Sequence, residues 1–115
     1  MIHDWNYIAR EQLNPLIVRQ AVHTDRMTVA HLHLTKGAVV PRHSHANEQV
    51  TVLERGRLRF EFDDGAEIVE AGQMLQIAGG RAHSVEALED SLALDLFSPR
   101  REDWIRGDDA YLRHK

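Results

Sequence analysis

The sequence predicts an all-β protein, built as an antiparallel sandwich or barrel of short strands. From about Leu16 to Phe97 the chain consists of short, partly apolar segments separated by turn-forming residues. Within this region, Arg57–Phe62 alternates strictly between apolar and charged residues, the period-two pattern of a strand with one buried face. Asp64-Gly65 follows it and is typical of a hairpin turn that needs a positive φ. We therefore expect a β-barrel core over approximately residues 16–97.

The remaining elements are expected on either side of this hairpin. Ala66–Val69 would be the return strand, Gln73–Ile77 the next strand and Ser91–Phe97 the last. Gly79-Gly80 interrupts the pattern shortly before His83. The first fifteen residues predict a flap, and the tail after Pro99 predicts a short helix or an irregular arm. We expect aromatic side chains of both extensions to pack on the barrel: Trp5, Tyr7, Trp104 and Tyr111.

Length and composition restrict the class of protein. The 115 residues predict one domain spanning residues 1–115, and 43% hydrophobic with 28% charged residues is typical of a globular chain. The absence of cysteine excludes disulfides and thiolate ligands, so a metal would need nitrogen and oxygen ligands. A formal net charge of -4 argues against a nucleic-acid partner. No segment resembles a signal peptide or a membrane span, so we expect no membrane association and a cytoplasmic location.

A candidate metal site follows from the spacing of histidines. His43 and His45 are two residues apart, so on a strand their imidazoles would point to the same face. Gln49 has the same parity as both histidines, and His83 lies 34 residues further on, where another strand could bring it across the barrel. Imidazoles and an amide oxygen suit one divalent ion such as zinc, nickel, iron, manganese or cobalt. The ligands do not determine which of these metals binds.

The oxygen ligand could be Glu48 or Gln49. A carboxylate is the better ligand for a hard cation, but Glu48 has the opposite parity to His45 unless a bulge intervenes. We therefore favour Gln49. A neutral glutamine would also leave the ion more electrophilic than a glutamate would.

Two sequence motifs resemble those of the cupin superfamily. The first is a glycine, five residues, His-x-His, three residues, the ligand position and six residues to a glycine, matched from Gly37 to Gly56 with Gln49 as the ligand. The second runs from Gly72 through Gly80 to His83, with Ala78 and Ala87 in place of the usual proline and asparagine. This resemblance implies a jelly-roll barrel, a double-stranded β-helix, with the metal in its lumen.

The last strand and the tail carry a narrower resemblance. In Ser91–Phe97 three leucines alternate with the other residues, and alternation alone leaves open whether Asp95 faces the lumen or solvent. The run Asp95–Trp104, which begins Asp-Leu-Phe-Ser-Pro-Arg-Arg, and the following Gly107–Arg113 resemble the C-terminal signature of the pectin-degradation cupins called KdgF. The resemblance implies that Asp95, Phe97 and Arg101 have catalytic roles beside the metal. Thr51, two residues beyond Gln49, occupies a position where a polar lumen residue is expected, and its part in substrate binding stays open.

Enzymes of this family open 4,5-unsaturated uronate monosaccharides, released from pectin or alginate, to the linear keto form. By this resemblance the chain would be an isomerase-type enzyme acting on a small sugar acid, with Asp95 as proton shuttle, Arg101 as a bidentate clamp for the substrate carboxylate and Phe97 as an apolar wall. Two alternatives remain open: another metal-dependent cupin enzyme such as an iron dioxygenase, or a non-catalytic sugar-binding or sensor module.

Two further expectations concern the surface. His31 and His33 form a second His-x-His pair with no ligand-type residue at the right offset, so we interpret them as surface or interface residues. The leucine face of Ser91–Phe97 and the apolar segment near Leu16–Ala21 offer more hydrophobic surface than a small barrel usually exposes. We therefore expect a homodimer.

Overall fold

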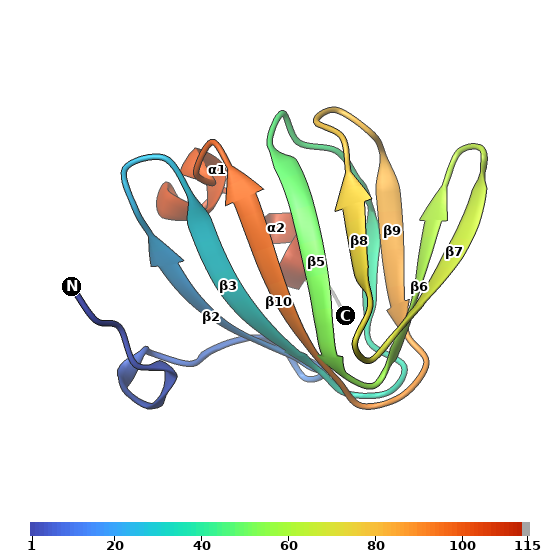
Figure 1. Ribbon diagram of the computed structural model, residues 1–115, viewed down its shortest axis with the longest axis horizontal. Helices are drawn as coiled ribbons and strands as arrows, with labels where there is room; N and C mark the ends of the chain where they lie inside the picture. Colours follow the sequence, from blue (N-terminus) through green and yellow to red (C-terminus); the bar gives the residue numbers. More distant parts are fainter. Residues whose placement is uncertain (114–115) are drawn as a thin grey trace.

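The structure is a computed structural model that describes residues 1–113. Its strands form two antiparallel sheets, one of six strands in the order β1-β2-β3-β10-β5-β8 and one of four in the order β4-β9-β6-β7. Figure 1 shows the larger sheet in front and the two short C-terminal helices behind it. The strands are β1 (Glu11–Asn14), β2 (Ile17–His23), β3 (Thr28–Leu34), β4 (Val39–His43), β5 (Glu48–Arg55), β6 (Arg57–Phe62), β7 (Gly65–Glu70), β8 (Met74–Ile77), β9 (His83–Ala87) and β10 (Ser91–Ser98). This arrangement confirms the predicted all-β fold.

Alternating burial along β6 explains how the core forms. Leu58, Phe60 and Phe62 are buried, whereas Arg57 and Glu61 on the opposite face are exposed. The aromatic and leucine side chains lie between the two sheets, where removal of apolar surface from water stabilises the fold. The hairpin that joins β6 to β7 has Gly65 at a φ of 145°, as the Asp-Gly pair predicted.

Gly56 allows the chain to cross from the larger sheet to the smaller one. It lies between β5 and β6 with a φ of 90°. A Cβ atom there would lie 2.2 Å from Ser91 Oγ and 2.4 Å from the carbonyl oxygen of Asp90. Both the left-handed conformation and this close approach require glycine.

Strand β10 lies between β3 and β5 in the larger sheet. Its residues Ala93, Asp95 and Phe97 point to the interior of the barrel, and its three leucines lie half-buried on the outer face of the sheet. Asp95 therefore lies on the lumen side of β10. The leucine face stays partly open to solvent in the single chain.

The two ends of the chain differ in part from the expectation. Residues 11–14 form β1, a strand paired with β2, although the whole N-terminal segment was expected to be a flap. Leu13 is the one apolar residue in this strand, so the sequence shows no alternation there. Residues Trp5–Tyr7 form a short 3-10 helix, η1, in which the ring of Trp5 packs on His31 while Tyr7 is 88% exposed, so the expected packing of Tyr7 was wrong.

The C-terminal tail forms two short helices, α1 (Glu102–Ile105) and α2 (Ala110–Arg113). Each buries one residue against the barrel, Trp104 from α1 and Leu112 from α2. None of the helices in residues 1–113 is long and apolar enough to cross a bilayer.

Candidate metal centre and active site

Three histidines converge at one end of the barrel. The nearest ring nitrogens of His43, His45 and His83 all lie within 4.8 Å of one another. His43 is the last residue of β4 and is paired in register with His83, the first residue of β9. His83 is thus the direct neighbour of His43 rather than a residue reaching across the barrel.

His45 lies in the loop of residues 44–47, beyond the end of β4. The expectation that one continuous strand carries both His43 and His45 was therefore wrong. Other parts of the chain hold this loop. The backbone amide of Gly80 donates a 2.8 Å hydrogen bond to the carbonyl of His45, and the side-chain amide of Asn47 donates to the carbonyls of Pro99 and Arg100.

The turn at Gly79-Gly80 also approaches the loop too closely for a larger residue. A Cβ atom on Gly79 would lie 2.4 Å from the carbonyl oxygen of Ala46. The second glycine motif of the sequence thus acts as a support for the loop that carries His45.

Backbone carbonyls fix the orientation of all three imidazoles. The Nδ1 atoms lie 2.8 Å from Pro41 O for His43, 3.0 Å from Asn47 O for His45 and 2.8 Å from Arg81 O for His83. A carbonyl oxygen can only accept, so each Nδ1 carries the proton and donates it. Each Nε2 then keeps its lone pair free for a metal ion, the arrangement typical of histidine ligands.

Burial keeps these imidazoles neutral. Desolvation is the largest cause that lowers the pKa of His43 to about 4 and that of His45 to about 4, with a smaller contribution from the charge of Arg101 in both. Burial also lowers the pKa of His83. Because a metal ion binds only the unprotonated nitrogen, the triad is ready to bind at neutral pH.

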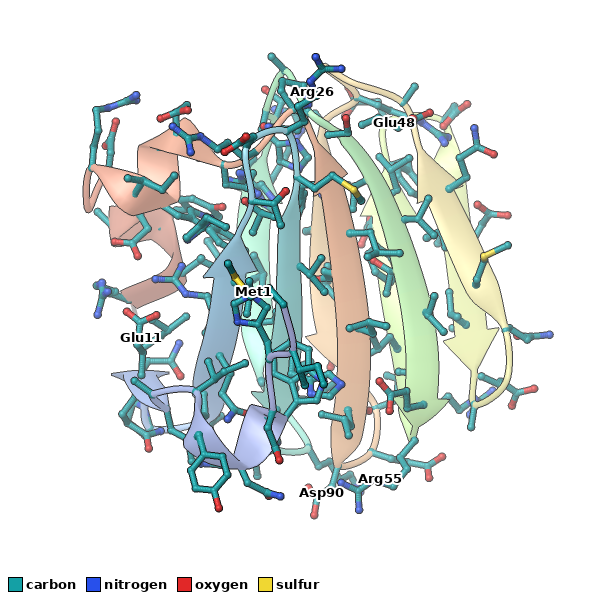
Figure 2. All side chains as sticks on the ribbon, turned by 60° about the vertical axis from the view of Figure 1, so that its left-hand side comes forward. Met1, Glu11, Arg26, Glu48, Arg55 and Asp90 are labelled. Atoms are coloured by element: carbon teal, nitrogen blue, oxygen red, sulfur yellow. The ribbon has the colours of Figure 1, made fainter. Side chains whose placement is uncertain are left out.

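Gln49 completes the donor set from β5. Its side chain is buried, and Glu48 is exposed at the start of the strand, where Figure 2 labels it at the edge of the molecule. Gln49 Oε1 lies 3.0 Å from Nε2 of His45. When the imidazole is neutral with its proton on Nδ1, both of these atoms are acceptors, so neither donates to the other. A distance of about 3 Å is also the separation expected of two ligand atoms that each lie about 2.1 Å from one ion. The donor set therefore fits a borderline divalent cation.

Asp95 lies in the same lumen, opposite Thr51 in the register between β10 and β5. The Thr51 hydroxyl donates a 2.7 Å hydrogen bond to Asp95 Oδ1 and accepts a 2.9 Å hydrogen bond from Gln49 Nε2. Burial raises the pKa of Asp95 to about 6, against the opposing effects of the Thr51 hydrogen bond and the charge of Arg101. A carboxyl group with such a pKa can both take up and release a proton near neutral pH.

Arg101 is fully buried beside this carboxyl group, with its guanidinium 4.7 Å from the ring of Phe97. Its Nε and Nη2 atoms donate to the two carboxylate oxygens of Asp103 at 3.0 Å and 2.8 Å, and Nη2 also donates to the hydroxyl of Tyr111 at 2.8 Å. Within residues 1–113, Nη1 makes no hydrogen bond. Side chains of the protein itself therefore already bind part of the Arg101 guanidinium, which was expected to hold the substrate carboxylate.

Tyr111 covers the site from the C-terminal helix α2. Its ring stacks on that of His43 with centroids 4.6 Å apart, and its hydroxyl also accepts a hydrogen bond from Trp104 Nε1. The cavity beside the histidines measures only about 50 Å³ and is lined by His43, Gln49, His83, Asp95, Phe97, Arg101, Trp104 and Tyr111 among others. Tyr111, Trp104 and Asp103 were not among the predicted site residues. The sequence signals for them were aromatic residues in a charged tail and a place in the runs that resemble the KdgF signature, in which no role was assigned to them.

The second histidine pair lies elsewhere. His31 and His33 are on the outer face of β3, where His31 Nε2 lies 2.7 Å from a carboxylate oxygen of Glu54 and His33 Nε2 lies 2.9 Å from Gln20 Oε1. Figure 2 shows the N-terminal segment from Met1 crossing in front of β2 and β3. Neither histidine belongs to the metal-binding cluster within residues 1–113.

Comparisons with known proteins agree with this geometry. The chain matches the family model of the cupin domain over residues 30–98. The structure of KdgF from Halomonas sp. is similar with a TM-score of 0.83 and 27% identity, over 90% of this chain and 99% of that one. An RmlC-like cupin from Shewanella frigidimarina NCIMB 400 is similar with a TM-score of 0.83 and 21% identity, over 90% of this chain and 94% of that one.

A more distant similarity shows the fold alone. Oxalate decarboxylase from Bacillus subtilis has a TM-score of 0.73 and 18% identity, over 84% of this chain and 28% of that one. No curated protein matches the chain in sequence. The match to the family model spans more than half of the chain, and the chain therefore belongs to the cupin family, with an overall structure similar to that of KdgF.

Proposed function

We propose that this cupin opens the ring of 4,5-unsaturated uronate monosaccharides to the linear keto form. The observation that carries the proposal is the cavity in which His43 and His83 of the histidine triad meet Asp95 and Arg101. The cavity thus combines a metal-binding group, an acid–base group and a cation. The similarity to KdgF over nearly the whole chain supports the same reaction class.

The reaction is an isomerisation that needs no co-reactant. In the closed sugar, the ring oxygen joins the anomeric carbon to carbon 5, which is double-bonded to carbon 4. A base removes the proton of the anomeric hydroxyl, the bond between the anomeric carbon and the ring oxygen breaks, and an aldehyde and an enolate form. A proton then adds to carbon 4, and the ring oxygen becomes the keto oxygen. One proton leaves and one arrives, so a single shuttle suffices.

Asp95 is suited to be this shuttle. With a pKa raised to about 6 by burial, its carboxylate can accept the hydroxyl proton near neutral pH and its acid form can return a proton to carbon 4. The hydrogen bond from Thr51 holds Oδ1, which leaves Oδ2 to exchange the proton with the substrate.

Arg101 would bind the substrate carboxylate. Its Nε–Nη2 edge is bound to Asp103, but the Nη1–Nη2 edge becomes available once the Tyr111 hydroxyl leaves Nη2. A bidentate pair on that edge would fix the sugar acid, with Phe97 as the apolar wall below the guanidinium. Arg101 is therefore not a preformed clamp, because Tyr111 has to move before the substrate carboxylate can bind.

A divalent ion held by His43, His45, Gln49 and His83 would supply a Lewis acid for a substrate oxygen and for the negative charge of the enolate. The cavity volume of about 50 Å³ holds little more than one water molecule, whose share of the liquid is about 30 Å³. A monosaccharide therefore needs the cover formed by α2 to open.

The test is conversion of freshly lyase-generated unsaturated uronate, followed by the decay of its absorbance. We expect metal-loaded protein to accelerate the decay over the spontaneous rate and a chelator to abolish the acceleration. Asp95→Asn is expected to lower kcat by about 10²- to 10⁴-fold, the usual range for loss of a general acid–base group. Arg101→Lys is expected mainly to raise KM, because a lysine cannot form the bidentate pair.

Matched controls are Asp25→Asn and Arg26→Lys, which change exposed residues between β2 and β3 and should leave both constants unchanged. A metal-loaded protein that gives no acceleration would contradict the proposal. Oxygen uptake with candidate substrates, or binding of sugar acids without turnover, would then separate the dioxygenase alternative from the binding module.

We also propose that the chain forms a homodimer through the outer face of the larger sheet. The leucines of β10 lie half-buried there, next to the valines of β5. A second copy of the chain would remove this apolar surface from water.

A further inference from the structure

Thr51 lies between a proposed metal ligand and the proposed proton shuttle. It is almost completely buried, and its side chain points into the lumen from β5. Its hydroxyl oxygen is 2.9 Å from Gln49 Nε2 and 2.7 Å from Asp95 Oδ1. Gln49 is two residues away on the same face of the same strand, and Asp95 is the Cα partner of Thr51 on β10. Two paired strands therefore fix all three side chains relative to one another.

The direction of these hydrogen bonds follows from the number of protons. A threonine hydroxyl has a single proton to donate. Above its pKa of about 6, Asp95 is a carboxylate and can only accept hydrogen bonds. The Thr51 hydroxyl therefore donates its one proton to Asp95. The Thr51 oxygen must then accept its other hydrogen bond, and the group on Gln49 that can donate to it is the NH₂ group.

This direction determines which end of the Gln49 amide faces the histidines. With Nε2 held by Thr51, Oε1 is turned toward the imidazoles and lies 3.0 Å from Nε2 of His45. An amide ligates a divalent cation through its oxygen, whereas the NH₂ group has no lone pair to offer. An amide in the opposite orientation would present N–H protons to the ion.

We propose that Thr51 is a positioning residue that selects the metal-binding orientation of Gln49. The short side chain suits this role, because its β-hydroxyl reaches both the carboxamide of Gln49 on β5 and the carboxylate of Asp95 on β10. The inference requires a bound divalent ion but not the ring-opening activity. It can therefore hold even if the proposed reaction is wrong.

The test compares metal affinities, measured without substrate. Zn²⁺ and Co²⁺ binding to purified, metal-free protein would be followed by calorimetry in competition with a chelator. Thr51→Val keeps the shape of the side chain and removes the hydroxyl, and we expect it to weaken binding by about 10- to 100-fold, as for other residues that orient metal ligands. Thr51→Ser keeps the hydroxyl and should bind within about threefold of the parent. The absorption spectrum of bound Co²⁺ should change in Thr51→Val and not in Thr51→Ser.

A second comparison separates orientation from packing. In a Gln49→Glu background both oxygens of the side chain are ligands, so no orientation has to be selected. Thr51→Val should then cost much less affinity than it does beside glutamine, which makes the two substitutions non-additive. An equal loss in both backgrounds, or parent-like binding by Thr51→Val, would overturn the inference. If Thr51→Val does not fold, Thr51→Ala serves the same comparison, with thermal unfolding of the metal-free protein as the check on folding.

Discussion

At the scale of single residues, burial has opposite effects on the two kinds of titratable group in the lumen. It lowers the pKa values of His43 and His45 to about 4, since a buried imidazole resists taking up a proton. It raises the pKa of Asp95 to about 6, since a buried carboxyl group resists losing one. The same desolvation thus keeps the imidazoles neutral and brings the Asp95 carboxyl group to a pKa at which the proposed proton shuttle could work.

The raised pKa of Asp95 predicts a cost to stability that depends on pH. The folded protein holds the Asp95 proton up to a pKa of about 6, and the unfolded chain loses it near 3.8. Between these values the folded state binds more protons, so this group lowers the unfolding free energy as pH rises from about 4 to 6. Asp95→Asn removes the effect while keeping a side-chain oxygen for Thr51.

We therefore expect metal-free Asp95→Asn to gain stability over the parent on going from pH 4 to pH 7.5, by up to about 3 kcal/mol. Urea unfolding of both proteins at the two pH values measures this difference. Comparing the variant with the parent cancels the contributions of the histidines, which both proteins share. A difference that stays constant between the two pH values would mean that Asp95 ionises normally.

At the scale of elements, the C-terminal segment closes the mouth of the barrel. A buried ion pair attaches it: Asp109, just before α2, accepts a 2.8 Å hydrogen bond from Arg19 on β2. Within the tail itself, Asp109 also pairs with Arg113. The side-chain amide of Asn14 donates to the carbonyl of Leu112. Tyr111 is thereby held over His43, where it occupies space and hydrogen bonds that a substrate would need.

This arrangement predicts that the Tyr111 hydroxyl competes with the substrate carboxylate for Arg101. Tyr111→Phe keeps the ring on His43 and removes the acceptor, which frees the Nη2 proton. We expect KM for unsaturated uronate to fall by about tenfold or more, the equivalent of one hydrogen bond to a charged group, with kcat little changed. Steady-state kinetics of both proteins measures it.

Tyr7→Phe is the matched control, because Tyr7 is exposed and lies far from the lumen in the N-terminal helix η1. A higher KM for Tyr111→Phe would show that the hydroxyl instead contributes to substrate binding.

At the scale of the whole molecule, the outer face of the larger sheet carries a group of partly exposed apolar side chains. Registered pairs place Leu94 beside Val52 and Leu96 beside Val50, and the next strand adds Met74 beside Val52. The N-terminal segment covers His31 at one side of this face, and the helices lie on the opposite side of the sheet (Figure 1). The centre of the face is left without a covering element in residues 1–113.

The proposed homodimer predicts that a charge at the centre of this face separates the protomers. We expect the parent to sediment as a dimer at micromolar concentration and Leu94→Arg to sediment as a monomer, because a buried unpaired charge opposes association. Analytical ultracentrifugation distinguishes the two states. Ile68→Arg places the same charge on β7, in the smaller sheet, and should leave the dimer intact. A monomeric parent would contradict the proposal.

Much of this protein could be predicted from its sequence because the responsible signals are local. Alternation placed β6 at Arg57–Phe62, and β10 extends only to Ser98 beyond its predicted end. Fixed spacings between glycines and histidines predicted the cupin fold, which the family match confirms. Parity along one strand favoured Gln49 over Glu48, and their side chains are buried and exposed respectively.

Contacts between distant segments were decided only by the tertiary structure. Parity could not show that His45 leaves the strand, because the loop that carries it is held by Gly80 and by the backbone after β10. Nothing local to Arg101 indicated that Tyr111 of α2 binds it. The sequence by itself determined the fold and the histidines that converge in the lumen, since both depend on periodicity and spacing. Their orientations, their pKa values and the cover over the site depend on burial and on hydrogen bonds across strands, and these exist only once the barrel has closed.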